Sequence, residues 1–151
     1  MSVVEGARMS GFVRDKDHWL NRLSPDEWIS AALGELARAE KALAAGDARA
    51  GVVGIKRAAG MALNGALIVE PDDAWGRSFV DHVEALARDA RVPEAVRAAG
   101  RMVVEARPPG GDVVSLRTPR GHTQVIEAAR DVIAHAWAVV KRHEGDANDR
   151  G

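Results

Sequence analysis

Cysteine is absent from this sequence of 151 residues. Disulfides, thiolate ligands for a metal and a cysteine nucleophile are therefore excluded. Aromatic residues are also scarce, because the sequence has no tyrosine, two phenylalanines and an aromatic share of 4%. Strands favour β-branched and aromatic residues, so a core built mainly from Ala, Leu and Val predicts closely packed helices.

An excess of charge of either sign is missing as well. The sequence has 21 Lys and Arg and 22 Asp and Glu, and its formal net charge is −1. This balance argues against a strongly basic protein that coats nucleic acid by charge alone, although it leaves room for a local basic groove. The first 19 residues lack the apolar core of a secretory signal, and the longest apolar runs fall far short of a membrane span. We expect a cytoplasmic protein with no membrane segment.

Hydrophobic residues make up 46% of the chain, which is enough for the core of one domain. The stretch SPDEW has the pattern of a capping box, in which Ser24 caps a helix and Glu27 completes the box. Apolar residues with helical spacing then predict a first helix over residues 24–45, ended by Gly46. Asp47 caps the next helix, so the two helices are expected to form an antiparallel hairpin.

Three further helices are expected at about 76–90, 93–106 and 123–143. The sequence thus predicts an all-α up-and-down bundle of four to five helices over residues 24–145. Residues 1–23 are predicted to form a mobile N-terminal arm, and residues 146–151 a disordered tail. The segment 107–122 is the one long irregular stretch, and we expect it to be functional or mobile.

The second helix is unusually rich in glycine, and each glycine costs a helix about 1 kcal/mol relative to alanine. The close approach of a neighbouring backbone would offset this cost. The partner helix belongs either to the same chain or to a second subunit, and the sequence leaves both alternatives open. The glycines concerned are Gly51, Gly54, Gly60 and Gly65.

The last helix combines an apolar face with a polar one. At about 100° per residue, the residues on the apolar face share one side and are expected to pack inward. They are Ile126, Ala129, Ile133, Trp137 and Val140. On the polar side, Glu127, Asp131 and His135 follow at intervals of four, so Asp131 is expected to accept a hydrogen bond from His135.

Arg130 lies on the flank of this helix and diverges from His135. Two copies of the helix that meet across a symmetric dimer would bring both residues together around one cleft. In the alternative interpretation, Arg130 forms an ordinary surface ion pair with Glu127, which contributes little.

The hairpin KALAAGDARAGVVGIKRAAGMALNGALI and the closing RDVIAH resemble the HEPN superfamily of bacterial and archaeal helical domains, over roughly residues 24–144. The motif of that family is an Arg, often a polar residue next, and a His four to six positions after the Arg. Arg130, Asp131 and His135 match this motif in order and spacing.

The resemblance implies a homodimeric, metal-independent endoribonuclease without a cofactor, which in several members is a toxin paired with an antitoxin protein. His135 would move a proton at the ribose 2′-hydroxyl or at the leaving oxygen, Arg130 would hold the scissile phosphate, and Asp131 would orient the histidine. The 2′-hydroxyl requirement would make the substrate RNA. Other members of the family have lost catalysis. The alternative function is therefore a non-catalytic helical interaction or nucleotide-binding domain, and an unrelated helical bundle is a third.

The remaining candidates are weaker. Four basic residues in and around the irregular segment form the most concentrated basic patch, which would bind RNA phosphates unless it is simply a solvated loop. These residues are Arg107, Arg117, Arg120 and His122. His82 lies near Asp81 and Glu84, but no H-x₃-H or H-E-x₂-H pair is present, so no metal site is predicted. Trp28, Trp75 and Trp137 are expected to anchor the core or an interface.

Overall fold

The computed structural model describes residues 22–108 and 119–150, and it describes only the backbone of residues 119, 120 and 146–150. All regular structure in these ranges is helical, which confirms the predicted all-α bundle. The elements are α2 (Pro25–Ala44), α3 (Ala48–Val69), the 3-10 helix η2 (Asp73–Trp75), α4 (Phe79–Arg88), α5 (Glu94–Glu105) and α6 (Pro119–Arg150). The predicted mobile arm, apart from its last two residues, lies outside the described ranges.

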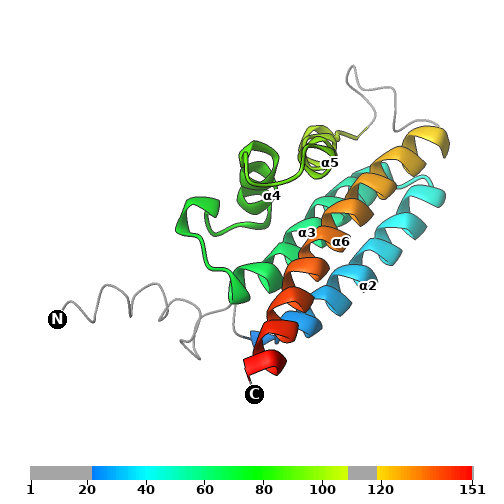
Figure 1. The fold of residues 1–151 in the computed structure, drawn as a ribbon. Coiled ribbons are helices and arrows are strands. Elements are labelled where there is room, and N and C mark those ends of the chain that lie inside the picture. The colour runs from blue at the N-terminus through cyan, green and yellow to red at the C-terminus, as the bar shows by residue number, and fades with distance from the viewer. Residues whose placement is uncertain (1–21, 109–118, 151) are drawn as a thin grey trace.

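Three long helices, α2, α3 and α6, lie side by side, and the short helices α4 and α5 cover one side of the α3–α6 pair (Figure 1). α2 and α3 are antiparallel, as the short Gly-Asp link predicts. α6 runs in the same direction as α3, since Glu70 at the end of α3 pairs with Arg142 of α6. The up-and-down order is therefore interrupted by α4 and α5, which return the chain to the end of the bundle where α6 begins.

The start of α2 and the turn into α3 follow the local signals in the sequence. The Ser24 hydroxyl accepts a hydrogen bond from the Glu27 amide at 3.1 Å, and the Glu27 carboxylate accepts one from the Ser24 amide at 2.8 Å. Gly46 adopts a φ of 88°, which favours glycine, and the Asp47 carboxylate then accepts the Ala50 amide at 3.1 Å. The predicted capping box and hairpin turn are both confirmed.

The glycines of α3 allow close packing within the chain. A Cβ atom on Gly54 would lie 2.9 Å from the Cβ of Ala39 in α2, and one on Gly60 would lie 2.6 Å from the Cα of Phe79 in α4. A Cβ on Gly65 would lie 2.8 Å from the carbonyl oxygen of Pro25. These distances are too short for real Cβ contacts. Of the two alternatives left open, the glycines therefore serve contacts with helices of the same chain.

α3 is also long and apolar enough to cross a membrane, judged by length and composition, and it is the one such helix in the described ranges. The uninterrupted apolar runs of the sequence are nevertheless short, because Lys56 and Arg57 lie within α3. In the bundle, 67% of its most apolar window is buried against other helices. Its composition is thus that of a central core helix.

α6 is longer than predicted at both ends. It begins at Pro119, a favourable residue for a first turn, so Arg120 and His122 lie in the helix and not in the preceding irregular segment. It continues to Arg150, and residues 146–150 are helical where a disordered tail was predicted. Gly145 does not stop the helix, because a glycine costs only about 1 kcal/mol and no proline follows.

The chain between α3 and α5 differs from the single helix that was predicted at 76–90. Residues 73–75 form η2, and α4 begins only at Phe79, after a second capping box in which Ser78 and Asp81 accept hydrogen bonds from each other's amides. Gly76 separates the two elements with a φ of 75°. This short break turns the chain, and Trp75 and Asp72 contact Asp89 and Arg91 in the link between α4 and α5.

Candidate functional site: a pocket beside His135

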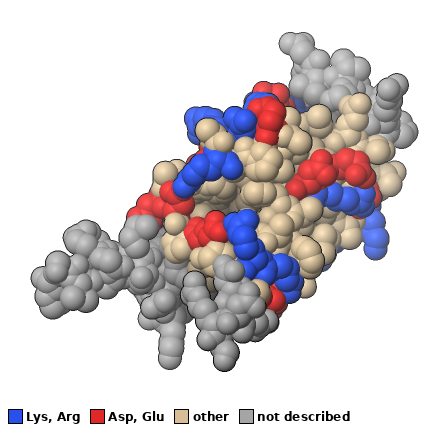
Figure 2. Space-filling view, in the orientation of Figure 1, with Lys and Arg blue, Asp and Glu red and all other residues tan. Residues whose placement is uncertain are grey.

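One pocket of about 460 Å³ lies between the C-terminal half of α3, η2, the link from α4 to α5, and the middle of α6. The face shown in Figure 2 is hollowed near its centre, with acidic and basic side chains at the edges of the hollow. The apolar lining comes mainly from α3, α6 and the α4–α5 link. It consists of Leu63, Ala66, Leu67, Pro71, Val92, Pro93 and Val139, and the polar or aromatic lining consists of Glu70, Asp72, Trp75, Asp89, Arg91, His135 and Arg142.

The floor of the pocket is part of the hydrophobic core. Leu63 is completely buried, and Leu67, Val92 and Val139 are nearly so. α3 and α6 pack against each other, and Ala66 and Ala136 belong to the same buried cluster. The floor is therefore a buried apolar surface of the kind found in small-molecule sites.

His135 projects from α6 into this pocket and is half-buried. Burial lowers the pKa of His135, and the positive charge of Arg142 lowers it further, while Glu70 opposes the shift. The imidazole is therefore neutral at pH 7, with one ring nitrogen as a donor and the other as an acceptor. No hydrogen bond joins His135 to any other residue that the structure describes.

Glu70 joins α3 to α6 at one edge of the pocket. Its Oε2 atom accepts hydrogen bonds from Arg142 at 2.7 Å and from His143 at 2.8 Å. Burial tends to raise the pKa of Glu70, but these two partners together hold it below its usual value. Glu70 is thus ionised, and Arg142 is already neutralised by it.

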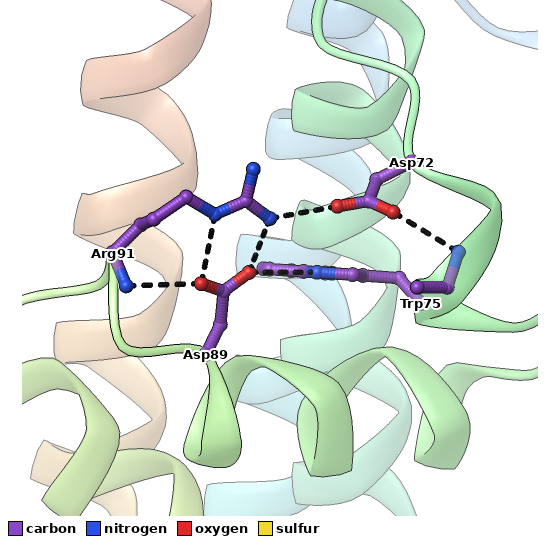
Figure 3. A network of polar contacts seen from close by, with 5 residues as sticks. Asp72, Trp75, Asp89 and Arg91 are labelled. Carbon is purple, nitrogen blue, oxygen red and sulfur yellow. Dashed lines mark hydrogen bonds and ion pairs between the residues drawn. The ribbon is translucent and has the colours of Figure 1, made fainter.

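Arg91 also lines the pocket and is the centre of a network of polar contacts (Figure 3). Its guanidinium binds both carboxylate oxygens of Asp89 and also Oδ2 of Asp72, at 2.8 Å in the latter case. The indole of Trp75 donates to Asp89 at 3.2 Å. We call these four residues the Arg91 clasp, and it ties η2 to the α4–α5 link. Hydrogen bonds from Arg91 hold the pKa of Asp89 far below its usual value, and those to Asp89 and Asp72 raise the pKa of Arg91.

The charge of the pocket lining is slightly negative. Its ionised residues are three carboxylates and two guanidinium groups, and His135 is neutral. Both guanidinium groups are paired with carboxylates of the same lining. The pocket therefore presents no unpaired positive charge to a phosphate.

The predicted catalytic residues are not gathered within one chain. Arg130 lies about 140° around α6 from His135, and it pairs with Glu127 and with Glu40 of α2, both at 2.9 Å. The alternative interpretation of Arg130 as a surface ion pair with Glu127 thus describes its position in this chain. Asp131 is exposed, and among the described residues no hydrogen bond links it to His135. Whether two chains bring Arg130 and His135 together stays a prediction.

The predicted inward face of α6 is wrong at one residue. Ile126, Ala129, Ile133 and Val140 are buried, whereas Trp137 is 49% exposed. Trp137 lies at the edge of the apolar face, about 40° beyond Ile133, and the ammonium of Lys141 lies 5.7 Å from the centre of its ring. Of the other two tryptophans, Trp28 is buried in the core and Trp75 is part of the Arg91 clasp.

The predicted basic patch has a structural role where its side chains are described. Arg107 donates to the carbonyl oxygens of Val104 at 3.3 Å and Ala106 at 3.4 Å, so it caps the end of α5. His122 is half-buried in the first turn of α6. Arg117 and the side chain of Arg120 lie outside the described ranges. A phosphate-binding role for this patch stays a prediction.

Sequence reasoning missed Arg91, Glu70 and Arg142 as site residues. Their signal in the sequence is weak, because each is a single charged residue that belongs to no recognisable motif. One local clue was the stretch EPDDAW, where two acidic residues and a tryptophan follow the end of a helix. The pairing of Asp72 with Arg91 across 19 positions depends on the tertiary fold.

No group of three His, Asp or Glu side chains in the described ranges is arranged to hold a metal ion. Comparisons of the chain with family models, with curated proteins and with solved structures found no match.

Proposed function

We propose that this chain is a non-catalytic helical binding domain that holds a small organic molecule in the pocket beside His135. This modifies the alternative that the sequence left open beside the ribonuclease, which was a non-catalytic helical interaction or nucleotide-binding domain. One observation carries the proposal: a pocket of about 460 Å³ has an apolar floor, and a neutral imidazole without a hydrogen-bond partner in the described structure faces into it. A concave apolar site with a few uncommitted polar atoms is typical of small-molecule binding.

The test is a ligand screen that reads out the pocket itself. The probes are small aromatic heterocycles, carboxylates, amines and nucleotides, and the readout is the NMR shift of the His135 ring protons. At least one class of probe should shift these signals in the wild type. The shift should be lost in Ala66→Leu, which fills the pocket, and kept in Ala37→Leu, an exposed position on α2. If no class of probe shifts His135, the proposal is wrong.

A metal-independent ribonuclease is the second candidate. The exposure of two of its predicted catalytic residues on α6 favours it. Arg130 and Asp131 are exposed, so a second copy of the chain can reach them, and the lowered pKa of His135 suits a general base. The test is the cleavage of a mixed RNA pool by the wild type, by His135→Ala and by Arg130→Ala. Activity that both substitutions abolish would support this candidate, and activity that His135→Ala leaves unchanged would exclude His135 from the mechanism. An antitoxin-like partner protein is expected only if the chain is such a ribonuclease.

A further inference from the structure

We infer that the pocket binds a small organic acid, whose anionic oxygens accept hydrogen bonds from Arg142 near His135 and whose apolar part lies on the floor. The inference rests on the proposed binding function and specifies its ligand class. It follows from the hydrogen-bond donors that the lining leaves unused, from the charges around Arg142 and from the apolar share of the lining. The anionic group is a carboxylate or a phosphate, because a guanidinium binds both in the same way.

The charged side chains of the lining have more unused donors than unused acceptors. A guanidinium carries five N–H groups. Arg142 uses one of them, from Nη2 to Glu70, and Arg91 uses three, so that its Nη1 points away from the clasp carboxylates without a hydrogen bond (Figure 3). Asp72 and Asp89 already accept with both oxygens, and Glu70 accepts with one. A ligand group that only accepts hydrogen bonds therefore complements this lining.

The surroundings of Arg142 suit an anion better than those of Arg91. The Arg91 clasp is net negative, because one guanidinium lies against two carboxylates. The bonding oxygen of Glu70, in contrast, is shared between Arg142 and His143. At His135 the charge of Arg142 lowers the pKa more than the charge of Glu70 raises it, so the two together act there as a positive charge. An anion between His135 and Arg142 is therefore attracted.

The position of Arg142 on α6 fits this arrangement. Arg142 follows His135 by seven residues, which is two helical turns, so both side chains lie on the same face of the helix. Both residues line the pocket. The unused N–H groups of Arg142 and the half-buried imidazole thus belong to one side of the same site.

The apolar share of the lining selects for an acid with an apolar part. The seven apolar lining residues offer no hydrogen bond from their side chains. An inorganic anion or acetate would leave this surface in contact with water. Covering it with an apolar group stabilises the complex in proportion to the area removed from water, so the organic acid should bind more tightly.

The experiment compares probes that share one apolar part. Phenylacetate and benzyl phosphate are acids, 2-phenylacetamide is the uncharged counterpart of phenylacetate, and acetate and inorganic phosphate lack the apolar part. NMR titration of the ring signals of His135 gives each dissociation constant. The wild type should bind at least one organic acid about tenfold more tightly than the amide, as expected for charge-assisted hydrogen bonds. The tighter acid identifies the anionic group, and it should also bind about tenfold more tightly than its counterpart without the apolar part.

The variant Arg142→Gln tests the place of the anionic group. Glutamine can still donate to Glu70, but it lacks the guanidinium. The variant should lose the preference for the acid and keep the affinity for the amide, which a misfolded protein would not do. The matched control is Arg38→Gln on α2, which removes another exposed arginine paired with a glutamate and should behave as the wild type.

Three results would overturn the inference while leaving the binding function in place. The amide binds as tightly as both organic acids, the acids bind no better than acetate and inorganic phosphate, or Arg142→Gln keeps the full preference for the acid. If heterocycles or amines shift the His135 signals and the acids do not, the ligand class is wrong as well. If no probe of any class shifts them, the proposed function fails together with the inference. The comparison of acid with amide on the wild type remains decisive even if Arg142→Gln does not fold.

Discussion

At the scale of single residues, His82 shows how burial in the bundle sets the protonation state of a side chain. Its side chain is almost completely buried in α4, and its Nδ1 donates to the carbonyl oxygen of Trp75 at 2.9 Å. Burial is the largest influence and lowers the pKa of His82, while the hydrogen bond to Trp75 and the charge of Asp81 raise it to a smaller extent. The neutral form of His82 is therefore part of the folded core.

This burial predicts that the protein loses stability in mild acid. Because the pKa of His82 is lower in the folded state, the unfolded state binds more protons once the pH falls below the unfolded value of about 6.5. The stabilisation is complete above that pH and is lost as the pH falls through the folded pKa. Urea denaturation at pH 7.5, 6.5 and 5.5 measures the slope of the free energy of unfolding against pH.

The variant His82→Asn keeps a donor for the carbonyl of Trp75 but does not titrate. We expect it to be less stable than the wild type at pH 7.5, because it leaves a cavity, and to lose less stability between pH 7.5 and 5.5. His135 contributes in the same direction, so part of the slope should persist. An equal slope in both proteins would contradict the role of His82.

Gly60 is a second residue whose role can be tested directly. The alanine side chain in Gly60→Ala would meet the backbone of Phe79, since its Cβ would lie 2.6 Å from the Cα atom. Moving α4 away should cost about 1–3 kcal/mol of the free energy of unfolding. The matched control is Gly34→Ala in α2, where the nearest atom to a new Cβ is the tip of Arg38 at 3.8 Å.

In Gly34→Ala the gain in helix propensity should raise stability by up to about 1 kcal/mol. Urea denaturation of the two variants in parallel gives the difference. A Gly60→Ala protein at least as stable as the wild type would show that α3 and α4 do not pack as closely as described.

At the scale of elements, the Arg91 clasp holds η2 and the α4–α5 link together. We expect Arg91→Gln to release the Trp75 indole from Asp89, because Asp89 would lose its main partner. The expected result is faster hydrogen exchange at the Trp75 indole and at the amides of residues 89–92, with little change in global unfolding. The guanidinium is largely exposed, so its ion pairs contribute little to overall stability.

The control for the clasp is Arg38→Gln, which removes an exposed ion pair with Glu35 on the far helix α2. Exchange-detected NMR of both variants compares the same amides. If Arg91→Gln leaves the exchange at residues 89–92 unchanged, the clasp does not order the pocket wall.

The elements themselves were largely predictable, because their signals are local. Ser24 with Glu27, and Asp47 after Gly46, act through hydrogen bonds to amides three residues away. The partner of the glycine-rich face was not predictable, since a sequence does not say which helix packs there. The true extent of α6 was missed because Gly145 is a weak stop signal and Pro119 also fits a first turn.

The site depends on the whole molecule, and therefore less of it was predictable. His135 was recognised as a candidate, but its surroundings come from α3, η2 and the α4–α5 link. Arg130 was expected to share its site, yet on a helix these positions point in different directions, and Arg130 pairs with Glu40. Pairing across long stretches of sequence leaves no periodic pattern.

At the scale of the whole molecule, the outer face of α2 and α6 is the surface through which we expect two chains to meet. Trp137 is 49% exposed and Leu33 of α2 is 51% exposed. Ion pairs lie near both ends of this face, Arg130 with Glu40 at one end and Lys141 with Asp26 at the other. An exposed tryptophan framed by polar residues is typical of a protein interface.

We therefore predict that the homodimer, if two α6 helices form it, depends on Trp137. The substitution Trp137→Glu would place a charge at the centre of that interface, so the dissociation constant should rise by at least about a hundredfold, as for other central tryptophans. Sedimentation equilibrium over a range of concentrations measures the change. The control is Val80→Glu, an equally sized charge change at an exposed apolar residue of α4. A wild type that stays monomeric at high concentration would rule out the dimer, and with it the shared cleft of Arg130 and His135 that the ribonuclease requires.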